Sequence, residues 1–513
     1  MGAGSEVGVV TGRAVPTGFR TRIRRAWPEG APGYALAALL LVGVLLRLIA
    51  IVSWWPLTST MGDGYERYAS SPFSNPLHPA GYSTILAAVG LVTREVAVPI
   101  LLQHLGGIVS GFLLWGATRR ITGSAWAGLL PAGIVLLDPD LIFLEHSLVA
   151  ESWLILAISA GLYAAVRAMD APDPYWRWPV LAGVAFSVGV MIRSAGLFLI
   201  PVSAVAVLIF RPRTVGRREY RWASLALVGA SAAMLLAFAT LNATLGERFG
   251  LGASPGWYLY ARAAQFADCT EFTPPPGTEV LCEDRPPSER PATADYLFSP
   301  AGPAQRHFGP LGNHDDLLGQ WARRAILAQS ADYLQNVWDY LSGYWFPDLR
   351  SKQASGGGLF QPFGGELDPQ LSFTNGFTGP YRAGLYPARF LALYHASTES
   401  FYNDFTVHQH RPGLEFLHGV QRVVRFGATA LSITTVLVLI GLLIGTRRSR
   451  VGVLLFGIGG LSLIIAPALT ANYYARYTIP MAGLLMAAAA ITIVELCRAA
   501  QARRQSAQIS RAS

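Results

Sequence analysis

Long apolar runs separated by polar stretches recur along the chain from residue 34 to residue 497. A run of about 20 apolar residues crosses the ~30 Å hydrocarbon core of a bilayer as an α-helix. The pattern predicts an all-α polytopic membrane protein with about ten transmembrane helices. They are expected at residues 34–55, 96–118, 124–143, 148–169, two within 178–210, and then 222–245, 422–445, 451–469 and 478–497.

One apolar run is too short to cross. Residues 79–92 number only about 14, which favours a helix lying on the membrane surface over a spanning one. If this run spanned the membrane, every later loop would change sides. The distribution of arginine therefore decides between the two topologies.

Arginine clusters orient the helices, because basic residues gather on the cytoplasmic side of membrane spans. With residues 79–92 on the surface, five groups fall on that side. They lie in the first 33 residues, at 119–120, at 211–221, at 447–450 and in the C-terminal tail. Both termini are then inside the cell, and residues 57–95 and 246–415 are outside it.

The amino-acid composition also indicates a membrane protein with several spans. Hydrophobic residues make up 52% of the chain and charged residues 14%, against about 25% charged in a soluble domain. One anchor on a soluble domain cannot give these values. The net charge of +9 comes almost wholly from arginines between apolar runs, so nucleic-acid binding is not indicated.

The runs divide the chain into five parts. These are a disordered cytoplasmic tail (1–33), seven helices with an external amphipathic loop at 57–95 (34–245), an extracytoplasmic domain of mixed or irregular fold (246–415), three helices (416–497) and a cytoplasmic tail (498–513). Inside the external domain, aromatic and aliphatic residues at helical spacing predict a helix over 315–344. Cys269 and Cys282 share a polar, proline-rich stretch there, and an oxidising exterior favours a disulfide between them.

Charged residues converge at the predicted outer ends of the helices, where a candidate site is expected because charge inside the bilayer is costly. Singly, each group has an ordinary explanation, as a solvated helix cap or a headgroup anchor. The groups are Asp63, Glu66, Tyr68 and His78 after the first helix; Asp138, Asp140, Glu145, His146 and Glu151 between the third and fourth; and Tyr474, Arg476, Tyr477 and Pro480 before the last, to which Arg193 is added.

Together these motifs resemble the GT-C glycosyltransferases, in particular the protein O-mannosyltransferase and aminoarabinose-transferase branch in its bacterial form. The similarity rests on an acidic residue after the first helix, a later His-Pro, an acidic hairpin, a Gly-x-x-x-Arg step and an Arg-Tyr-x-x-Pro element. It covers residues 34–210 and 420–497. The acidic pair Asp63 and Glu66 is spaced as Asp-Gly-Tyr-Glu, whereas adjacent Asp-Glu is common in that branch.

The resemblance implies transfer of a sugar from a polyprenyl-phosphate carrier to a hydroxyl of a glycan, lipid or protein, at the outer face of the cytoplasmic membrane, by one inverting displacement. Asp63 is the expected base, with Glu66 second, because a positioned carboxylate can take the acceptor's proton. Arginine is suited to bind the carrier's phosphate, because its guanidinium can make two charge-assisted hydrogen bonds to phosphate oxygens. The residues expected to bind substrate or phosphate are His78, Asp138, Asp140, Glu151, Arg193, Tyr474, Arg476 and Tyr477. No cofactor is required, although carboxylates could hold a divalent ion.

Three other functions compete with this one: a polysaccharide polymerase or ligase, a transporter or flippase of a lipid-linked sugar, and a non-enzymatic scaffold. A transporter predicts polar residues at mid-membrane and often an inverted repeat. Only Arg47 lies deep within a predicted span, and the other charges gather at one face. The sequence therefore favours the glycosyltransferase.

Overall fold

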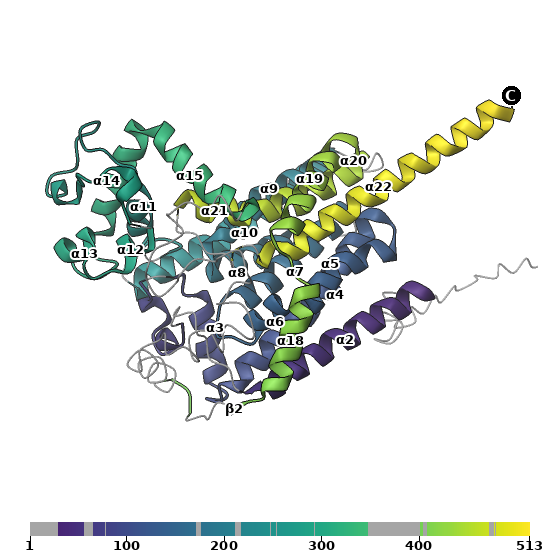
Figure 1. The fold of residues 1–513 in the computed structure, drawn as a ribbon, viewed down its shortest axis with the longest axis horizontal. Coiled ribbons are helices and arrows are strands. Elements are labelled where there is room, and N and C mark those ends of the chain that lie inside the picture. The colour runs from purple at the N-terminus through teal and green to yellow at the C-terminus, as the bar shows by residue number, and fades with distance from the viewer. Residues whose placement is uncertain are drawn as a thin grey trace, which may run out of the picture.

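The computed structural model is an α-helical bundle with a smaller helical lobe at one end (Figure 1). It describes residues 29–55, 65–76, 78–170, 176–210, 217–246, 248–252, 254–291, 293–346, 401–403, 408–470, 477 and 479–512.

Each predicted apolar run contains helix. The bundle consists of α2 (Ala31–Ser53), α4 (Ala97–Thr122), α5 (Ala125–Leu137), α6 (Pro139–Glu145), α7 (Glu151–Met169), α8 (Arg177–Ile192), η3 (Ser194–Phe198), α9 (Leu199–Ile209), α10 (Arg217–Leu245), α18 (Arg411–Val423), α19 (Ala428–Ile444), α20 (Arg447–Val453), the π-helical turn η8 (Leu454–Ile458), α21 (Gly459–Thr470) and α22 (Ile479–Ala512).

The predicted count of about ten spans is not confirmed. Within the described residues, seven helices are long and apolar enough to cross a membrane, or eight if the bent α5–α6 pair is one span. The two helices predicted within 178–210 are present but shorter. The predicted single helix at 124–143 is wrong, because the chain bends by 56° between α5 and α6.

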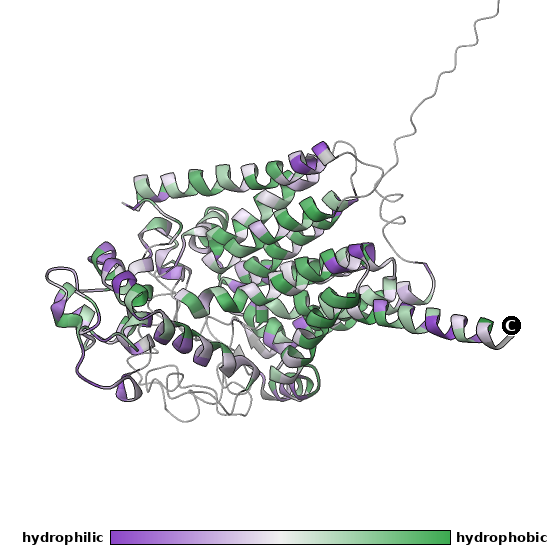
Figure 2. Cartoon of the chain, turned by 90° about the horizontal axis from the view of Figure 1, so that it is seen from above, coloured by the Kyte–Doolittle hydropathy of each residue, from purple (hydrophilic) through white to green (hydrophobic). Residues whose placement is uncertain are grey.

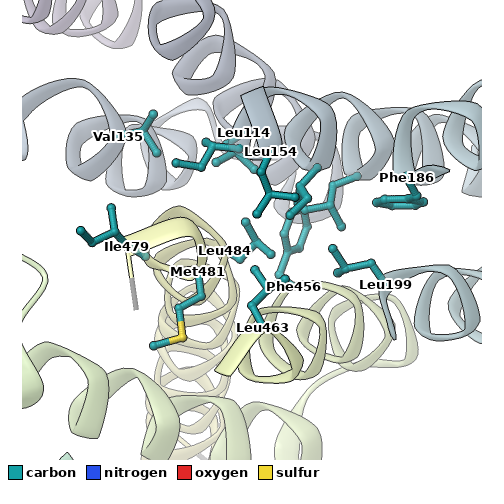
Figure 3. Packing of buried hydrophobic residues seen from close by; sticks show 14 of the residues in the cluster. Leu114, Val135, Leu154, Phe186, Leu199, Phe456, Leu463, Ile479, Met481 and Leu484 are labelled. Atoms are coloured by element: carbon teal, nitrogen blue, oxygen red, sulfur yellow. The ribbon is translucent and has the colours of Figure 1, made fainter. Parts of the chain in front are cut away.

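Hydrophobic residues dominate the long helices of the bundle, and hydrophilic residues gather at helix ends and in the lobe (Figure 2). Leu41, Leu45 and Val52 of α2 are exposed, as expected for side chains that face lipid. In the core, aliphatic and aromatic side chains from α4, α5, α7, α8, α9, η8, α21 and α22 pack together (Figure 3). Helix α22 lies among them and continues as helix beyond residue 497, where a tail was predicted.

Arginines of three predicted clusters, at 119–120, at 447–450 and in the C-terminal tail, lie at the end of the bundle far from the lobe. Asp170, after α7, pairs with Arg120 of α4 at 3.0 Å and with Arg448 of α20 at 2.9 Å. Arg498 of α22 donates to the Thr122 carbonyl at 2.5 Å. Groups that the positive-inside rule assigns to one side thus lie together.

Short elements occupy the opposite end, next to the lobe. They are the paired two-residue strands β1 (Trp54–Trp55) and β2 (His408–Gln409), the 3-10 turns η1 (Tyr65–Tyr68) and η2 (Pro72–Ser74), and α3 (Gly81–Gly90). Helix α3 is the short helix predicted at 79–92. A Cβ atom on Gly81 would lie 2.4 Å from the Met191 carbonyl oxygen, so glycine allows α3 to approach the end of α8.

The lobe contains α11 (Pro255–Ala263), η4 (Glu279–Leu281), η5 (Pro287–Glu289), α12 (Thr293–Phe298), α13 (Pro303–Phe308), α14 (Asp315–Ala328) and α15 (Ser330–Trp345). In its described residues it is helical with loops, not mixed. The single helix predicted over 315–344 is interrupted at Gln329. Trp257, Tyr260 and Trp321 are buried in a core of its own. The predicted disulfide joins Cys269 to Cys282, with the Cα atoms 5.8 Å apart.

Candidate active site

The acidic residues between α5 and α7 are buried and not solvated. Asp138, Asp140, Glu145 and Glu151 expose between 0% and 4% of their surfaces. Asp138 caps α6 by accepting the Asp140 N–H at 2.9 Å, which stabilises the bend. Buried carboxylates are costly unless they are paired, so their partners decide their roles.

The first two carboxylates hold α6 against α18. Asp140 accepts the Arg425 Nε–H at 2.7 Å and also a hydrogen bond from the Gln421 amide. The second oxygen of Asp138 accepts the Phe426 N–H at 2.9 Å. Both acids were expected to bind substrate. In the structure their contacts join two segments that lie almost 300 residues apart in sequence.

Glu145 occupies a second ionic cluster, with Arg47 of α2 and His104 of α4. Arg47 donates to both carboxylate oxygens, at 2.7 and 2.6 Å, and His104 Nδ1 lies 3.0 Å from one of them. The other His104 nitrogen is 2.9 Å from Nδ1 of His146. Arg47 also donates to the carbonyl of Leu136 at 2.9 Å. The charge predicted to lie alone within a span is therefore neutralised.

Glu151, Arg193 and Tyr477 meet from three parts of the chain. Glu151 begins α7, Arg193 follows the last residue of α8, and Tyr477 lies just before α22. Arg193 Nη2 is 3.0 Å from a Glu151 oxygen, and its guanidinium carbon lies 5.4 Å from the centre of the Tyr477 ring. Arg193 is 9% exposed, whereas Glu151 is fully buried. The sequence had assigned all three to the site.

The loop after α2 supplies Glu66 and His78 to the same end. Glu66 is buried, and the neighbouring Tyr65 stacks on His78 with ring centres 4.8 Å apart. Tyr65 also packs edge-on against Tyr82 of α3 at 4.9 Å. This packing of aromatic rings holds the loop over the bundle.

Tyr82 connects the loop to the buried acids. Its hydroxyl donates to Gln103 at 2.7 Å, and the Gln103 amide donates to the Glu145 carbonyl at 2.8 Å. Burial raises the pKa of Tyr82 well above its usual value, and nearby Tyr402 and the carboxylates of Glu66 and Glu151 raise it further. The Tyr82 hydroxyl therefore stays protonated and acts as a neutral hydrogen-bond donor near Glu66 and Glu151, two acids predicted for the site.

Asp63, Tyr474 and Arg476, on which the predicted base and phosphate contacts depend, lie outside the described residues. Of the described residues near them in sequence, Tyr65 contacts His78 and Tyr82, and Tyr477 contacts Arg193. Among the described residues, no three His, Cys, Asp or Glu side chains are grouped as metal ligands.

Four members of these clusters were not predicted from the sequence, namely Gln103, His104, Gln421 and Arg425. The sequence contains a signal for two of these residues. Gln103 and His104 are adjacent polar residues in an apolar run, and such residues usually face the interior of a bundle. Their partners in space could not be identified from spacing.

Residues 100–245 match the family model described as dolichyl-phosphate-mannose-protein mannosyltransferase. This is less than half of the chain, and it includes Glu145, Glu151 and Arg193. Over this segment the match confirms the resemblance to the protein O-mannosyltransferase branch of the GT-C superfamily. A comparison with curated protein sequences finds no match.

Solved structures similar to this chain share little sequence with it. A protein O-mannosyltransferase complex of S. cerevisiae bound to its sugar donor has 15% identity and a TM-score of 0.35, with 45% of this chain and 37% of that one covered. The oligosaccharyltransferase of Archaeoglobus fulgidus in its apo form has 13% identity and a TM-score of 0.43, with 89% and 50% covered. The archaeal oligosaccharyltransferase AglB of Archaeoglobus fulgidus, in complex with an inhibitory peptide and a dolichol-phosphate, has 13% identity and a TM-score of 0.42, with 90% and 50% covered. The chain spans half the length of these structures or less.

Proposed function

We propose that this chain is a membrane glycosyltransferase that moves a sugar from a polyprenyl-phosphate carrier to an acceptor hydroxyl. The observation that carries the proposal is the meeting of Glu151, Arg193 and Tyr477 at one end of the bundle, with the first two inside the segment that matches the mannosyltransferase family. The arginine-rich end is then cytoplasmic and the site faces the outside.

The carrier's phosphate needs a cation close to the membrane surface. Arg193 supplies one at the end of α8, balanced by Glu151 while no substrate is bound. A guanidinium has five N–H donors in a planar fork, so Arg193 can keep its contact with Glu151 and offer other donors to phosphate oxygens. Arg476, next to Tyr477 in the sequence, is a second phosphate ligand in this proposal. Both contacts strengthen as the leaving phosphate gains negative charge.

The acceptor hydroxyl attacks the anomeric carbon and loses its proton to a carboxylate, while the bond from that carbon to the carrier's phosphate oxygen breaks. Asp63 is the proposed base, because it lies two residues before Tyr65 and matches the family's acidic position after the first helix. Glu66 is the nearest alternative. One displacement without a covalent intermediate inverts the anomeric centre.

The remaining predicted acids belong to the scaffold in this account. Asp138 and Asp140 already accept hydrogen bonds from Phe426, Gln421 and Arg425, which leaves them poorly placed to bind a sugar. They fix α6 and, with it, the start of α7 that carries Glu151. Their substitution should therefore reduce the amount of folded protein before it changes catalysis.

Separate measurements of carrier binding and turnover test the roles. Asp63→Asn keeps the shape and removes the base, so transfer should fall roughly 10²-fold or more while carrier binding is retained. Arg193→Ala should weaken both. Arg177→Ala is the matched control, since Arg177 is an exposed arginine at the other end of the same helix. Arg193→Ala with normal carrier affinity would remove Arg193 from the phosphate site.

A further inference from the structure

Helix α15 of the lobe has an apolar stripe whose first part is exposed. Leu334 is 61% exposed and Trp338 is 58% exposed. Leu341 and Trp345 continue the stripe at helical spacing and pack against the bundle core. Large exposed apolar side chains in a row are unusual for a helix in water and mark a surface that something else covers.

Contacts on its other side fix the orientation of α15. The buried Arg262 of α11 stacks on Tyr340, with its guanidinium carbon 3.6 Å from the ring centre, and donates to Asn336 at 3.1 Å. At the bundle, the Tyr333 hydroxyl donates to the Leu469 carbonyl at 2.8 Å. The stripe is therefore held outward by the fold and does not result from a loosely attached helix.

The last turn of α15 reaches a helix of the bundle. Trp345 Nε1 donates to Thr435 Oγ1 of α19 at 3.1 Å. Near this contact, α19 exposes Ile433, Val436 and Leu439, each to more than half of its surface. In a membrane-spanning bundle this is a lipid-facing surface, and the stripe of α15 continues it. Figure 1 shows α15 leaving the lobe and meeting the bundle beside α21.

Helix geometry places Trp338 at the level where the apolar span begins. Thr435 lies seven residues, or about 10 Å, inside the first residue of α19. Trp338 lies seven residues before Trp345, so it can rise from that level by at most about 10 Å. Trp338 is therefore expected near the level at which α19 starts. Helix α19 has 17 residues, about 25 Å, which is shorter than the ~30 Å hydrocarbon core it must cross.

We propose that the stripe of Leu334 and Trp338 is inserted into the bilayer leaflet on the lobe's side, at the boundary between headgroups and acyl chains. Tryptophan favours this boundary because its ring is apolar and its N–H is polar. The exposed Asp332 projects from another side of the helix and stays in water. Helix α15 thus anchors the lobe to the membrane, and this contact fixes the distance between the lobe and the candidate active site.

Depth-dependent quenching tests this placement in the full-length protein. Cys269 and Cys282 are joined in a disulfide, and Cys497 is free and exposed, so Cys497→Ser gives a background with no free thiol. Trp338→Cys is then labelled with an environment-sensitive dye and reconstituted in phosphatidylcholine vesicles that contain doxyl-labelled lipids. Asp332→Cys, six residues away on the same helix and also exposed, is the matched control.

The dye at 338 is expected to emit at shorter wavelength and to lose emission to doxyl groups near the headgroups, while the dye at 332 does neither. Equal behaviour at both positions would overturn the proposal. A dye at 338 that is shielded from water but unaffected by doxyl lipids would also overturn it, because protein would then cover the stripe. The measurement is repeated at two protein-to-lipid ratios. Shielding that increases with the amount of protein would show that a second copy of the chain covers the stripe.

Discussion

A single added methyl group probes the ionic cluster beneath the site. A Cβ atom on Gly107 of α4 would lie 1.8 Å from a Glu145 carboxylate oxygen and 2.3 Å from its carboxyl carbon. Gly107→Ala therefore requires the Glu145 carboxylate to move. A Cβ atom on the neighbouring Gly106 meets only the Leu156 side chain at 3.4 Å, which is ordinary contact, so Gly106→Ala is the matched control.

The magnitude follows from what Glu145 holds. Its carboxylate accepts hydrogen bonds of 2.7 and 2.6 Å from Arg47, and the two side chains are only 2% and 3% exposed. Leaving such a charge buried without its partner costs about 3 to 5 kcal/mol. Replacing glycine by alanine in a helix returns about 1 kcal/mol. Gly107→Ala should thus destabilise the protein by about 2 to 4 kcal/mol, while Gly106→Ala should stabilise it by up to about 1 kcal/mol.

The free energy of unfolding of both variants is measured by SDS titration in mixed micelles, with helical circular dichroism as the signal. The two variants differ by one position and have the same composition, so general effects of alanine cancel between them. Equal stability of Gly107→Ala and Gly106→Ala would refute the reasoning, because Glu145 would then not lie against α4 as described.

Three further predictions concern other parts of the chain. Joint replacement of Cys269 and Cys282 by serine should destabilise the lobe by about 3 kcal/mol in denaturant titration, and intact-mass analysis of the native protein should show two hydrogens gained on reduction. Arg448→Met should cost no more than about 1 kcal/mol in the SDS titration, because that ion pair is partly exposed and screened. Burial raises the pKa of Asp315, so the folded lobe favours the protonated carboxyl. Lobe stability should therefore decrease as the pH rises from about 4, the pKa of Asp in the unfolded chain, through the higher pKa of Asp315 in the folded lobe. Asp315→Asn keeps an oxygen for the Trp257 N–H and should remove that dependence in thermal unfolding measured across pH.

The approximate positions of most bundle helices could be predicted, because a long apolar run along the sequence marks a segment that can be buried in lipid. The pairing of Cys269 with Cys282 was predictable for a similar reason, since the chain offers only one nearby pair. The arginine clusters likewise predicted which helix ends lie on the same side of the membrane. In the structure, Asp170 pairs with arginines from two of these clusters. Each of these inferences needs composition over a short window and no knowledge of distant contacts.

The interior of the site could not be predicted in the same way. The sequence indicates that Arg47 and Glu145 are unusual, but their pairing across 98 positions depends on how α2 packs against α5 and α6. Asp140 has its partner in Arg425, 285 positions later, between α18 and α19, where the sequence predicted the start of a membrane helix. The bend between α5 and α6 was missed, although Asp138, Pro139 and Asp140 interrupt the apolar run at the point where α6 begins.

The central claim is that the end of the bundle bearing Glu151 and Arg193 transfers a sugar from a lipid carrier. The most direct measurement places the purified protein in nanodiscs with a polyprenyl-phosphate sugar and extracts of the cell envelope as acceptor. Release of sugar-free polyprenyl phosphate is then followed by mass spectrometry. The account predicts that the wild-type chain discharges the carrier and that Asp63→Asn does so roughly 10²-fold more slowly or worse. A wild-type chain that leaves every carrier sugar intact, or an Asp63→Asn variant that discharges it at the wild-type rate, would contradict the account.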